Sequence, residues 1–420
     1  MAKERYSMRM PRVILGFFGS LGTGVLLTWS YYREPLLQMF PQWTFSDLSL
    51  IFSVHNLMVS FMMAFSGFIM KKMSTRTAYV LTAMCFLVGL GGFHFLPPDN
   101  QTLAFAIAFI LYGFIAPIGV GAGCVLSLAI YPAWYPERAG SIGGVMVFAF
   151  NSAALLAGAL ASILLPRVGI LDTMSATGVI VAVFMLASAP LGVYPSKKDK
   201  LPPAPVRPEN KTSYQYKTKE MLKSPAFWSL FFFHALFFTS SLIFADHAAG
   251  IAVYFGAAAL IGMLFAPAKG VSCVAAGWLM DKFTTIGSMI ILSSSLMVAS
   301  GILLVGAFQH SAPIVMTGMI MVSLSCGGAS TIRATALRFL FGSEHYQQNI
   351  GVSYLSVVVS AILAYCASLI IEALGGSYTG VFFVILSAGI LSIAFTAHLH
   401  FFMKKRANVT MPGESEVPEI

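Results

Sequence analysis

Long apolar runs recur from one end of the chain to the other, and no other feature constrains the fold as strongly. Most are at least about 20 residues long, enough for a helix to cross the hydrocarbon of a bilayer. The chain of 420 residues is 57% hydrophobic and only 10% charged, more apolar than a soluble domain of this size. We therefore expect an all-α integral membrane protein with twelve transmembrane helices: 12–32, 47–70, 77–96, 102–131, 140–165, 172–194, 225–246, 251–280, 285–308, 312–339, 349–373 and 378–403.

Lysine and arginine are distributed unevenly among the segments that connect these runs. If the N-terminus is cytoplasmic, 21 of the 25 lysines and arginines fall in cytoplasmic segments, and only Arg33 and Arg167 fall in outer ones. Positive residues gather on the cytoplasmic side of membrane proteins, so both termini are expected there, in a multi-pass protein of the inner membrane. This distribution accounts for the net charge of +9, and no nucleic-acid partner is expected.

The chain divides into two halves. Residues 196–224 form a cytoplasmic linker rich in proline and lysine that cannot bury a core. It separates an N-terminal six-helix bundle (1–195) from a C-terminal one (225–405), which a disordered cytoplasmic tail (406–420) follows. SGFIMKKMSTR at 66–76 is echoed by AGWLMDKFTTI at 276–286, with Gly67 and Gly277 half a chain apart. Such pseudo-symmetric halves place a transport site at their interface, near the midplane.

One charge interrupts the apolar run 251–280. Lys269 lies 12 residues before Asp281, which puts it roughly 18 Å from the helix end and near the middle of the bilayer. An ammonium there is costly unless it meets water, a partner or a ligand. We expect Lys269 to receive a substrate carboxylate. The alternative is a snorkelling or neutral lysine, hydrogen-bonded to carbonyls that Pro267 frees.

Carboxylates are expected only near the ends of the runs. On the outer side these are Glu34, Asp47, Asp99, Asp172, Asp246 and Glu372. A binding site for a cation requires a carboxylate near the middle of the membrane. The pattern therefore argues against a cationic substrate and against a proton relay built from carboxylates.

Further side chains could contact a substrate. Arg333 is a candidate second anion contact in an inward-facing vestibule, or else a snorkelling residue. His55 and His234 are either proton carriers or packing residues, and Asn56 and Asn151 bind a substrate or link helices. Trp29 lies deeper than the aromatic belt and is expected to close the outer mouth over the substrate.

Four stretches carry a family resemblance. They are GVLLTWSYYREPL (24–36), YPAWYPERAGSIGG (131–144), EMLKSPAFW (220–228) and GWLMDK (277–282). Together they resemble major facilitator superfamily transporters, and within them the branch of oxalate/formate antiporters and monocarboxylate transporters. The resemblance implies transport of small organic acids, and it implies that Tyr112 faces the cavity, since the span that contains it usually lines the centre.

The chain also departs from that branch. The arginine usual in span eight is replaced by Cys273, with Lys269 one turn earlier on the same face, and span eleven has no lysine. Leu26 and Leu27 stand where the branch has polar residues. Oxalate, which needs two cationic contacts, is therefore disfavoured.

The loop motifs are expected to act as gates. The Asp281 carboxylate can accept hydrogen bonds from the helix start around Gly140, or pair with Arg138, and so hold the cytoplasmic side shut. In the first half Lys71 stands where that acid belongs, which weakens or reverses the symmetry-related latch. The full set of expected gating residues is Asp281, Lys282, Gly277, Gly67, Lys71, Arg76, Glu137 and Arg138.

These observations predict a secondary transporter for a small organic anion, a monocarboxylate, working by antiport or proton symport as a monomer in the lipid bilayer. No enzyme motif, metal cluster or cofactor motif is found in the sequence, so no cofactor is expected. One competing hypothesis is efflux of an amphipathic or neutral compound through a cavity lined by leucine, phenylalanine and methionine. The other is a sensor that binds a ligand without moving it.

Overall fold

The computed structural model describes residues 9–70, 73–196, 199, 201–202, 215–342 and 345–409. Every regular element in these residues is a helix. Eleven stretches are long and apolar enough to cross a membrane. One of them, α8 (Ala139–Ser188), contains two spans joined at Gly169, whose φ of 78° breaks the helix. Counting both gives twelve, which confirms the predicted all-α fold of two six-helix bundles.

Two spans of the N-terminal half are broken within the membrane. The first changes to a short 3-10 segment in its middle, and the fourth contains a π-helical turn. In chain order the elements are α2 (Arg9–Thr23), η1 (Gly24–Thr28), α3 (Trp29–Met39), α4 (Phe45–Met70), α5 (Thr75–Gly89), η2 (Gly91–Phe95), α6 (Gln101–Ile110), η3 (Leu111–Ile115), α7 (Ala116–Ala133), η4 (Pro136–Arg138) and α8.

The C-terminal half repeats the six spans with breaks before α12 and before α16. Its elements are α9 (Thr218–Lys223), α10 (Pro225–Tyr254), α11 (Ala259–Gly262), α12 (Phe265–Lys282), α13 (Thr285–Phe308), α14 (Ala312–Phe341), α15 (Tyr346–Ser353), α16 (Ser356–Ala373) and α17 (Thr379–Val409).

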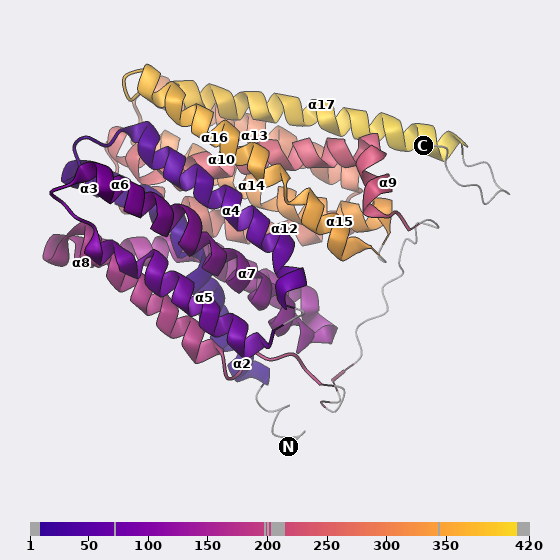
Figure 1. Cartoon of the computed structure of the whole chain (residues 1–420). Helices are drawn as coiled ribbons and strands as arrows, with labels where there is room; N and C mark the ends of the chain where they lie inside the picture. The colour runs from indigo at the N-terminus through magenta and orange to yellow at the C-terminus, as the bar shows by residue number, and fades with distance from the viewer. Residues whose placement is uncertain are drawn as a thin grey trace.

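The two halves lie side by side (Figure 1). The described chain begins at α2 and ends at α17 at one end of the bundle, opposite α3 and α6, as an even number of spans requires. We call this the inner end and the opposite one the outer end. The most extensive contacts between the halves are those of α3 with α10, α4 with α16, and α8 with α12. The α8–α12 contact is tight, since a Cβ added at Gly270 would lie 3.1 Å from the Cα of Phe148.

Several boundaries differ from the sequence-based expectation. Helix α10 continues to Tyr254, eight residues beyond the predicted end at 246, because the apolar residues after His247 remain helical. Asp246 therefore lies roughly 12 Å inside this helix instead of at its end. The end of the linker is also ordered onto the C-terminal half, where the Tyr216 N–H donates to the Phe341 carbonyl at 3.0 Å. Helix α17 extends to Val409, past the predicted start of the tail.

Candidate functional site

Lys269 is buried where α12 faces α10. Its side chain is 7% exposed, and its ammonium lies 4.6 Å from the centre of the Phe238 ring. Within the described ranges, no carboxylate lies at ion-pair distance from this ammonium and no carbonyl accepts a hydrogen bond from it. The described residues thus offer the charge an aromatic face and no counter-ion.

His234 lies one turn before Phe238 on α10, and its imidazole is fixed on both sides. Nδ1 is 2.7 Å from the Ser356 hydroxyl and Nε2 is 3.1 Å from the Ser330 hydroxyl. The ring also stacks on Phe238 with centroids 5.3 Å apart. Phe238 therefore contacts both His234 and Lys269, which ties the two basic side chains into one cluster.

Arg333 on α14 is a second buried cation without a carboxylate among the described residues. It is 1% exposed, its Nη1 donates to the Ser353 hydroxyl at 3.2 Å, and its guanidinium lies 4.2 Å from the centre of the Tyr354 ring. Nε is buried and has no hydrogen-bond partner in the described part of the chain. The side chain thus points into the bundle, in contrast to the snorkelling arrangement considered from the sequence.

These basic groups lie at two depths. Counted along their helices, Lys269 and Phe238 are each roughly 20 Å from the inner end. His234 and Arg333 are roughly 14 and 12 Å from it. The imidazole is close enough to both cations for their charges to act on it. The C-terminal half therefore carries a basic column that leads from mid-membrane toward the inner end.

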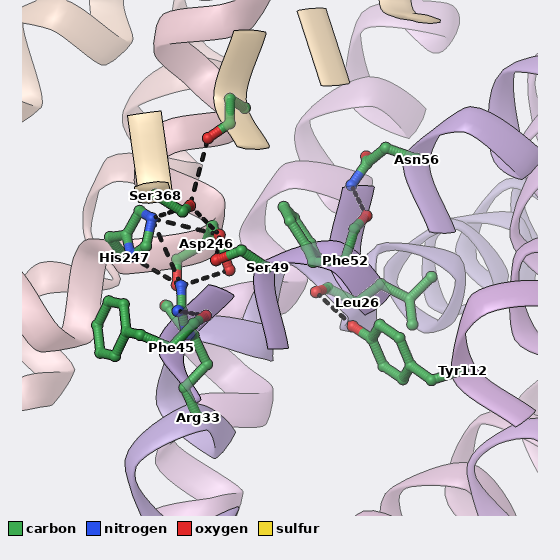
Figure 2. A network of polar contacts seen from close by, with 12 residues as sticks. Leu26, Arg33, Phe45, Ser49, Phe52, Asn56, Tyr112, Asp246, His247 and Ser368 are labelled. Carbon is green, nitrogen blue, oxygen red and sulfur yellow. Dashed lines mark hydrogen bonds and ion pairs between the residues drawn. The ribbon is translucent and has the colours of Figure 1, made fainter. Parts of the chain in front are cut away.

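The N-terminal half contributes an aromatic cluster. The Trp29 and Tyr112 rings lie 4.2 Å apart, and the His55 ring is 4.7 Å from that of Tyr112. His55 Nδ1 donates to the Tyr112 carbonyl at 2.6 Å. The Tyr112 hydroxyl donates to the Leu26 carbonyl at 3.2 Å (Figure 2). Trp29, placed by the sequence at an outer mouth, is 1% exposed inside this cluster.

Three of the predicted site residues in this half each have a buried polar atom without a hydrogen-bond partner among the described residues. These atoms are Nε1 of Trp29, Nε2 of His55 and Oδ1 of Asn151. Asn151 and Asn56 each donate their amide to a carbonyl four residues back on their own helix, both at 2.8 Å. Unsatisfied buried polar atoms are rare and mark sites where a ligand or water can bind.

Asn151 is a predicted residue of this half that packs against α12, the helix that carries Lys269. A Cβ added at Gly270, the neighbour of Lys269, would lie 3.3 Å from the Cβ of Asn151. The structure thus packs Asn151 against α12 beside Gly270, across the interface between the halves. His55, Tyr112 and Trp29 form their own cluster, and no direct contact links them to Lys269 in the described residues.

Among the expected gating residues, Glu137 has a partner in its own half. Its carboxylate lies 2.5 Å from Nη2 of Arg9, whose Nε donates to the Trp134 carbonyl at 2.7 Å. Burial alone would raise the pKa of the Glu137 carboxyl. Hydrogen bonds from its own backbone and from Arg9, with the charges of Arg9 and Arg138, outweigh this and hold the pKa below its usual range.

The other expected gating residues are seen only in part. Arg76 and Arg138 are exposed, and the Lys282 ammonium is 5.0 Å from the centre of the Trp278 ring. Asp281, Gly277 and Gly67 lie within helices, but the surroundings of their side-chain positions are outside what the structure describes, as is Lys71 altogether. The Asp281 latch therefore stays a prediction.

One polar network was missed from the sequence. Arg33 on α3 and Asp246 on α10 form a buried ion pair of 2.7 Å near the outer end, joined by His247, Ser49 and Ser368 (Figure 2). The sequence argument treated both charges as ends of spans. One signal in the sequence could have predicted the pair. Arg33 lies on the first span of the N-terminal half and Asp246 on the first span of the C-terminal half, so the pseudo-symmetry of the halves places them at corresponding positions.

Two repeated helical halves are the architecture of a class of protein, the solute transporters of the membrane, and this chain adds buried cations that have no carboxylate partner among the described residues. The sequence matches the family model of the Major Facilitator Superfamily over residues 13–365, and the chain belongs to that family. It is 24% identical over 349 residues to the uncharacterized MFS-type transporter YhjX of Escherichia coli (strain K12), which covers 81% of this chain and 82% of the relative.

Solved structures of distant sequence share the fold. A D-xylose-proton symporter superimposes with a TM-score of 0.69 at 16% identity, covering 93% of this chain and 97% of that one. The xylose transporter XylE from E. coli, in a partially occluded inward open conformation, superimposes with a TM-score of 0.67 at 14% identity, covering 99% of this chain and 100% of that one. A bacterial homologue of the iron transporter ferroportin, in an outward-facing state, superimposes with a TM-score of 0.62 at 16% identity, covering 93% of this chain and 99% of that one. At these identities the likeness concerns the fold alone.

Proposed function

We propose that the protein moves a small organic anion, a monocarboxylate, across the membrane by alternating access, as an antiporter or proton symporter. The observation that carries this proposal is the ammonium of Lys269, buried at mid-membrane with an aromatic ring and no counter-ion among the described residues.

Electrostatics favours an anion over the other solute classes. A buried charge without a partner is costly, and a bound carboxylate would supply both the opposite charge and a hydrogen-bond acceptor. A hydrogen bond to a charged group contributes about 1.5–3 kcal/mol. A neutral sugar would leave the charges of Lys269 and Arg333 uncompensated, and a cation would be repelled by both.

Each residue of the site has a role in this proposal. Lys269 binds the carboxylate, and Asn151 Oδ1 accepts a hydrogen bond from a hydroxyl or N–H of the substrate. Arg333 receives the anion on its way toward the inner end. His234, held by two hydroxyls, positions the Phe238 ring. Trp29, Tyr112, His55 and Asn56 form the wall of the N-terminal half.

The motif resemblance supports the same substrate class. The stretches at 24–36 and 131–144 resemble the oxalate/formate antiporter and monocarboxylate transporter branch. We assign the chain to that branch as part of the proposal. Asp281 is proposed to latch the inner end against the start of α8, so that Asp281→Asn lowers the exchange rate without removing substrate binding.

The test is substrate flux in proteoliposomes with a panel of monocarboxylates and their neutral amides. Lys269→Gln should lower carboxylate flux about 10- to 100-fold, as the loss of a charged hydrogen bond predicts, while Lys269→Arg keeps part of it. Lys404→Gln, an exposed lysine on α17, is the matched control. Unchanged flux in Lys269→Gln would contradict the proposal. Equal transport of acids and amides would favour efflux of neutral or amphipathic compounds, and binding without flux would favour a sensor.

A further inference from the structure

Among the described residues, hydrogen bonding uses only part of the Arg333 guanidinium. Nη1 donates to the Ser353 hydroxyl at 3.2 Å, and this hydroxyl donates in turn to the Ile350 carbonyl at 2.7 Å. Nε is buried and has no hydrogen-bond partner in that part of the chain. Nε–H and one N–H of Nη2 point along the same edge of a guanidinium, and together they fit the two oxygens of a carboxylate. This edge of Arg333 is therefore a receptor for a planar oxyanion.

The position of this side chain is fixed before any ligand binds. Arg333 is 1% exposed, and its guanidinium lies 4.2 Å from the centre of the Tyr354 ring. Ser353 and Tyr354 lie where α15 ends, at the break before α16, so both contacts come from the same point of the backbone. Arginine keeps its proton in proteins, so the charge is permanent. A rigid, charged receptor loses little entropy when it binds an anion.

Lys269 lies too far along the bundle to share one carboxylate with Arg333. A Cβ added at Gly327 of α14 would overlap the carbonyl oxygen of Lys269, so these two residues lie at the same depth. Arg333 follows Gly327 by six residues, roughly 9 Å along the helix. Because α12 and α14 both run from the outer to the inner end, both side chains lean the same way and this spacing is kept. The two oxygens of a carboxylate are only about 2.2 Å apart.

His234 lies between the two cations in depth and adds no charge of its own. The Ser356 hydroxyl donates to the Ser353 carbonyl at 2.8 Å, so its oxygen accepts from Nδ1–H of the imidazole at 2.7 Å. Nε2 then accepts from the Ser330 hydroxyl at 3.1 Å. This arrangement uses the one N–H and the one lone pair of a neutral imidazole. The basic column therefore holds two positive charges, and no carboxylate pairs with either of them among the described residues.

We propose that the basic column binds two carboxylates at the same time, one at the ammonium of Lys269 and a second at the Nε edge of Arg333. A single monocarboxylate at Lys269 leaves Arg333 buried with its charge uncompensated, and a buried charge without a partner is costly. Oxalate, whose two carboxylates are directly bonded, is too short to reach both side chains across roughly 9 Å. Two monocarboxylates give each cation its own counter-ion.

The second site deepens the proposed function and rests on it. The proposed function supplies the class of ligand and the first site at Lys269. The new element is that Arg333 holds a carboxylate of its own while the first site is occupied. Arg333 is nearer the inner end than Lys269, so a carboxylate that enters from the inner side reaches Arg333 first. An incoming carboxylate therefore binds before the outgoing one has left.

The test uses the purified full-length protein in detergent, with acetate as the probe carboxylate. Thermal unfolding midpoints are measured for wild type, Lys269→Gln, Arg333→Gln and the double variant. Each protein is measured in about 50 mM sodium acetate and in sodium chloride of the same ionic strength, so that the effect of a substitution on stability itself cancels. A ligand stabilises the folded protein at each site that it occupies, and the contributions of independent sites add.

Acetate should raise the wild-type midpoint above its value in chloride. Each single variant should keep part of this shift, about half for two sites of equal affinity, and the double variant should lose it. Arg338→Gln, which removes an exposed arginine of the same helix, is the matched control and should keep the whole shift. Loss of the entire shift in either single variant would mean that both cations bind one anion. That result would overturn the inference, as would equal wild-type midpoints in acetate and chloride, or a shift with succinate alone, which would indicate one bridging dicarboxylate.

A second measurement observes Arg333 directly, by NMR of protein whose arginines carry a nitrogen isotope label. The Nε–H resonance of Arg333 is identified by its absence from Arg333→Lys. Acetate should shift this resonance in wild type and also in Lys269→Gln, because the second site does not need the first, and chloride should not shift it. A resonance that acetate leaves unchanged would overturn the second site even where Lys269→Gln abolishes carboxylate flux. A shifted resonance together with flux that Lys269→Gln leaves intact would contradict the transport role of Lys269 alone.

Discussion

The ammonium of Lys269 and the ring of Phe238 face each other across α12 and α10 at 4.6 Å, and the same ring stacks on His234. A cation–π contact contributes about 0.5–2 kcal/mol, less than an ion pair in a dry site. The ring therefore holds the lysine in place without satisfying its charge. This arrangement suits a group that must exchange one partner for a passing ligand.

The first prediction concerns this ring. Phe238→Leu removes the cation–π contact from the empty site, so the substrate-free protein should be less stable by about 0.5–2 kcal/mol. In this variant the ammonium of Lys269 has lost its aromatic partner. A bound carboxylate should therefore increase the stability of the protein by more than it does in wild type. Thermal unfolding in detergent, with and without the acid, measures both effects. Phe238→Tyr keeps the ring face and serves as control; if Phe238→Leu and Phe238→Tyr behave alike, the ring has no such role.

The second prediction separates the two cations by depth. Arg333 lies roughly 8 Å closer to the inner end than Lys269. Arg333→Gln should therefore raise the KM for substrate supplied from the inner side about 10-fold or more, and affect substrate binding from the outer side less. Lys269→Gln should impair both directions. Inside-out and right-side-out vesicles distinguish these outcomes.

The control for this experiment lies on the same helix. Arg338 is five residues further along α14, with its guanidinium 4.6 Å from the centre of the Tyr346 ring, and it is exposed. Arg338→Gln removes a comparable charge nearer the surface and should leave the KM on both sides within about twofold. An equal effect of Arg333→Gln and Arg338→Gln would mean that Arg333 acts only through the general field of the inner end.

A third prediction concerns the pair of Glu137 and Arg9. The pKa of Glu137 is lowered in the folded protein, so the pair stabilises the fold above the ordinary carboxyl pKa and loses this effect as the pH falls through the lowered value. Because Glu137 is 29% exposed, the effect at neutral pH should be below about 1 kcal/mol. Glu137→Gln should thus unfold at a slightly lower temperature than wild type at about pH 7, and the two should converge in acid below about pH 4.

Thermal unfolding at these pH values checks this expectation, with Glu372→Gln as control, since Glu372 is an exposed acid of α16. The control should match wild type throughout. A difference between Glu137→Gln and wild type that persists or grows in acid would show that the substitution acts on packing, because the charge of Glu137 is then absent from both proteins.

The spans were predictable because a bilayer allows few solutions to a chain of long apolar runs, and the position of Lys269 followed from counting along one helix. The break at Gly169 inside α8 agrees with two predicted spans on either side of it. In contrast, the predicted C-terminal end of α10 was wrong, although its start at Pro225 was predicted correctly. The charges of Asp246 and His247 mark a helix end by composition, but here Arg33, Ser49 and Ser368 satisfy them inside the bundle.

Contacts between side chains of different helices could not be predicted from the sequence for a related reason. Nothing in the spacing of Asn151 shows that it packs beside Gly270, or that Arg333 turns inward onto Tyr354. These contacts depend on the rotation of each helix, which a run that is apolar on all faces leaves undetermined. The sequence identifies the residues that carry charge, and the fold decides which of them meet.

Helix rotation is itself fixed by close approach, and the last prediction tests one such point. A Cβ added at Gly24 would lie 1.7 Å from the carbonyl oxygen of Phe150, where η1 crosses α8. Backbone cannot yield there as a flexible side chain could, so Gly24→Ala should cost about 1–3 kcal/mol or prevent folding. Gly301 on α13 has open space around its Cβ position, and Gly301→Ala should stabilise by up to about 1 kcal/mol through helix propensity. Yield and thermal unfolding of the two variants in detergent compare the sites directly. Equal behaviour would mean that η1 and α8 can separate at Gly24 without loss, and that this crossing does not set the rotation of the first span.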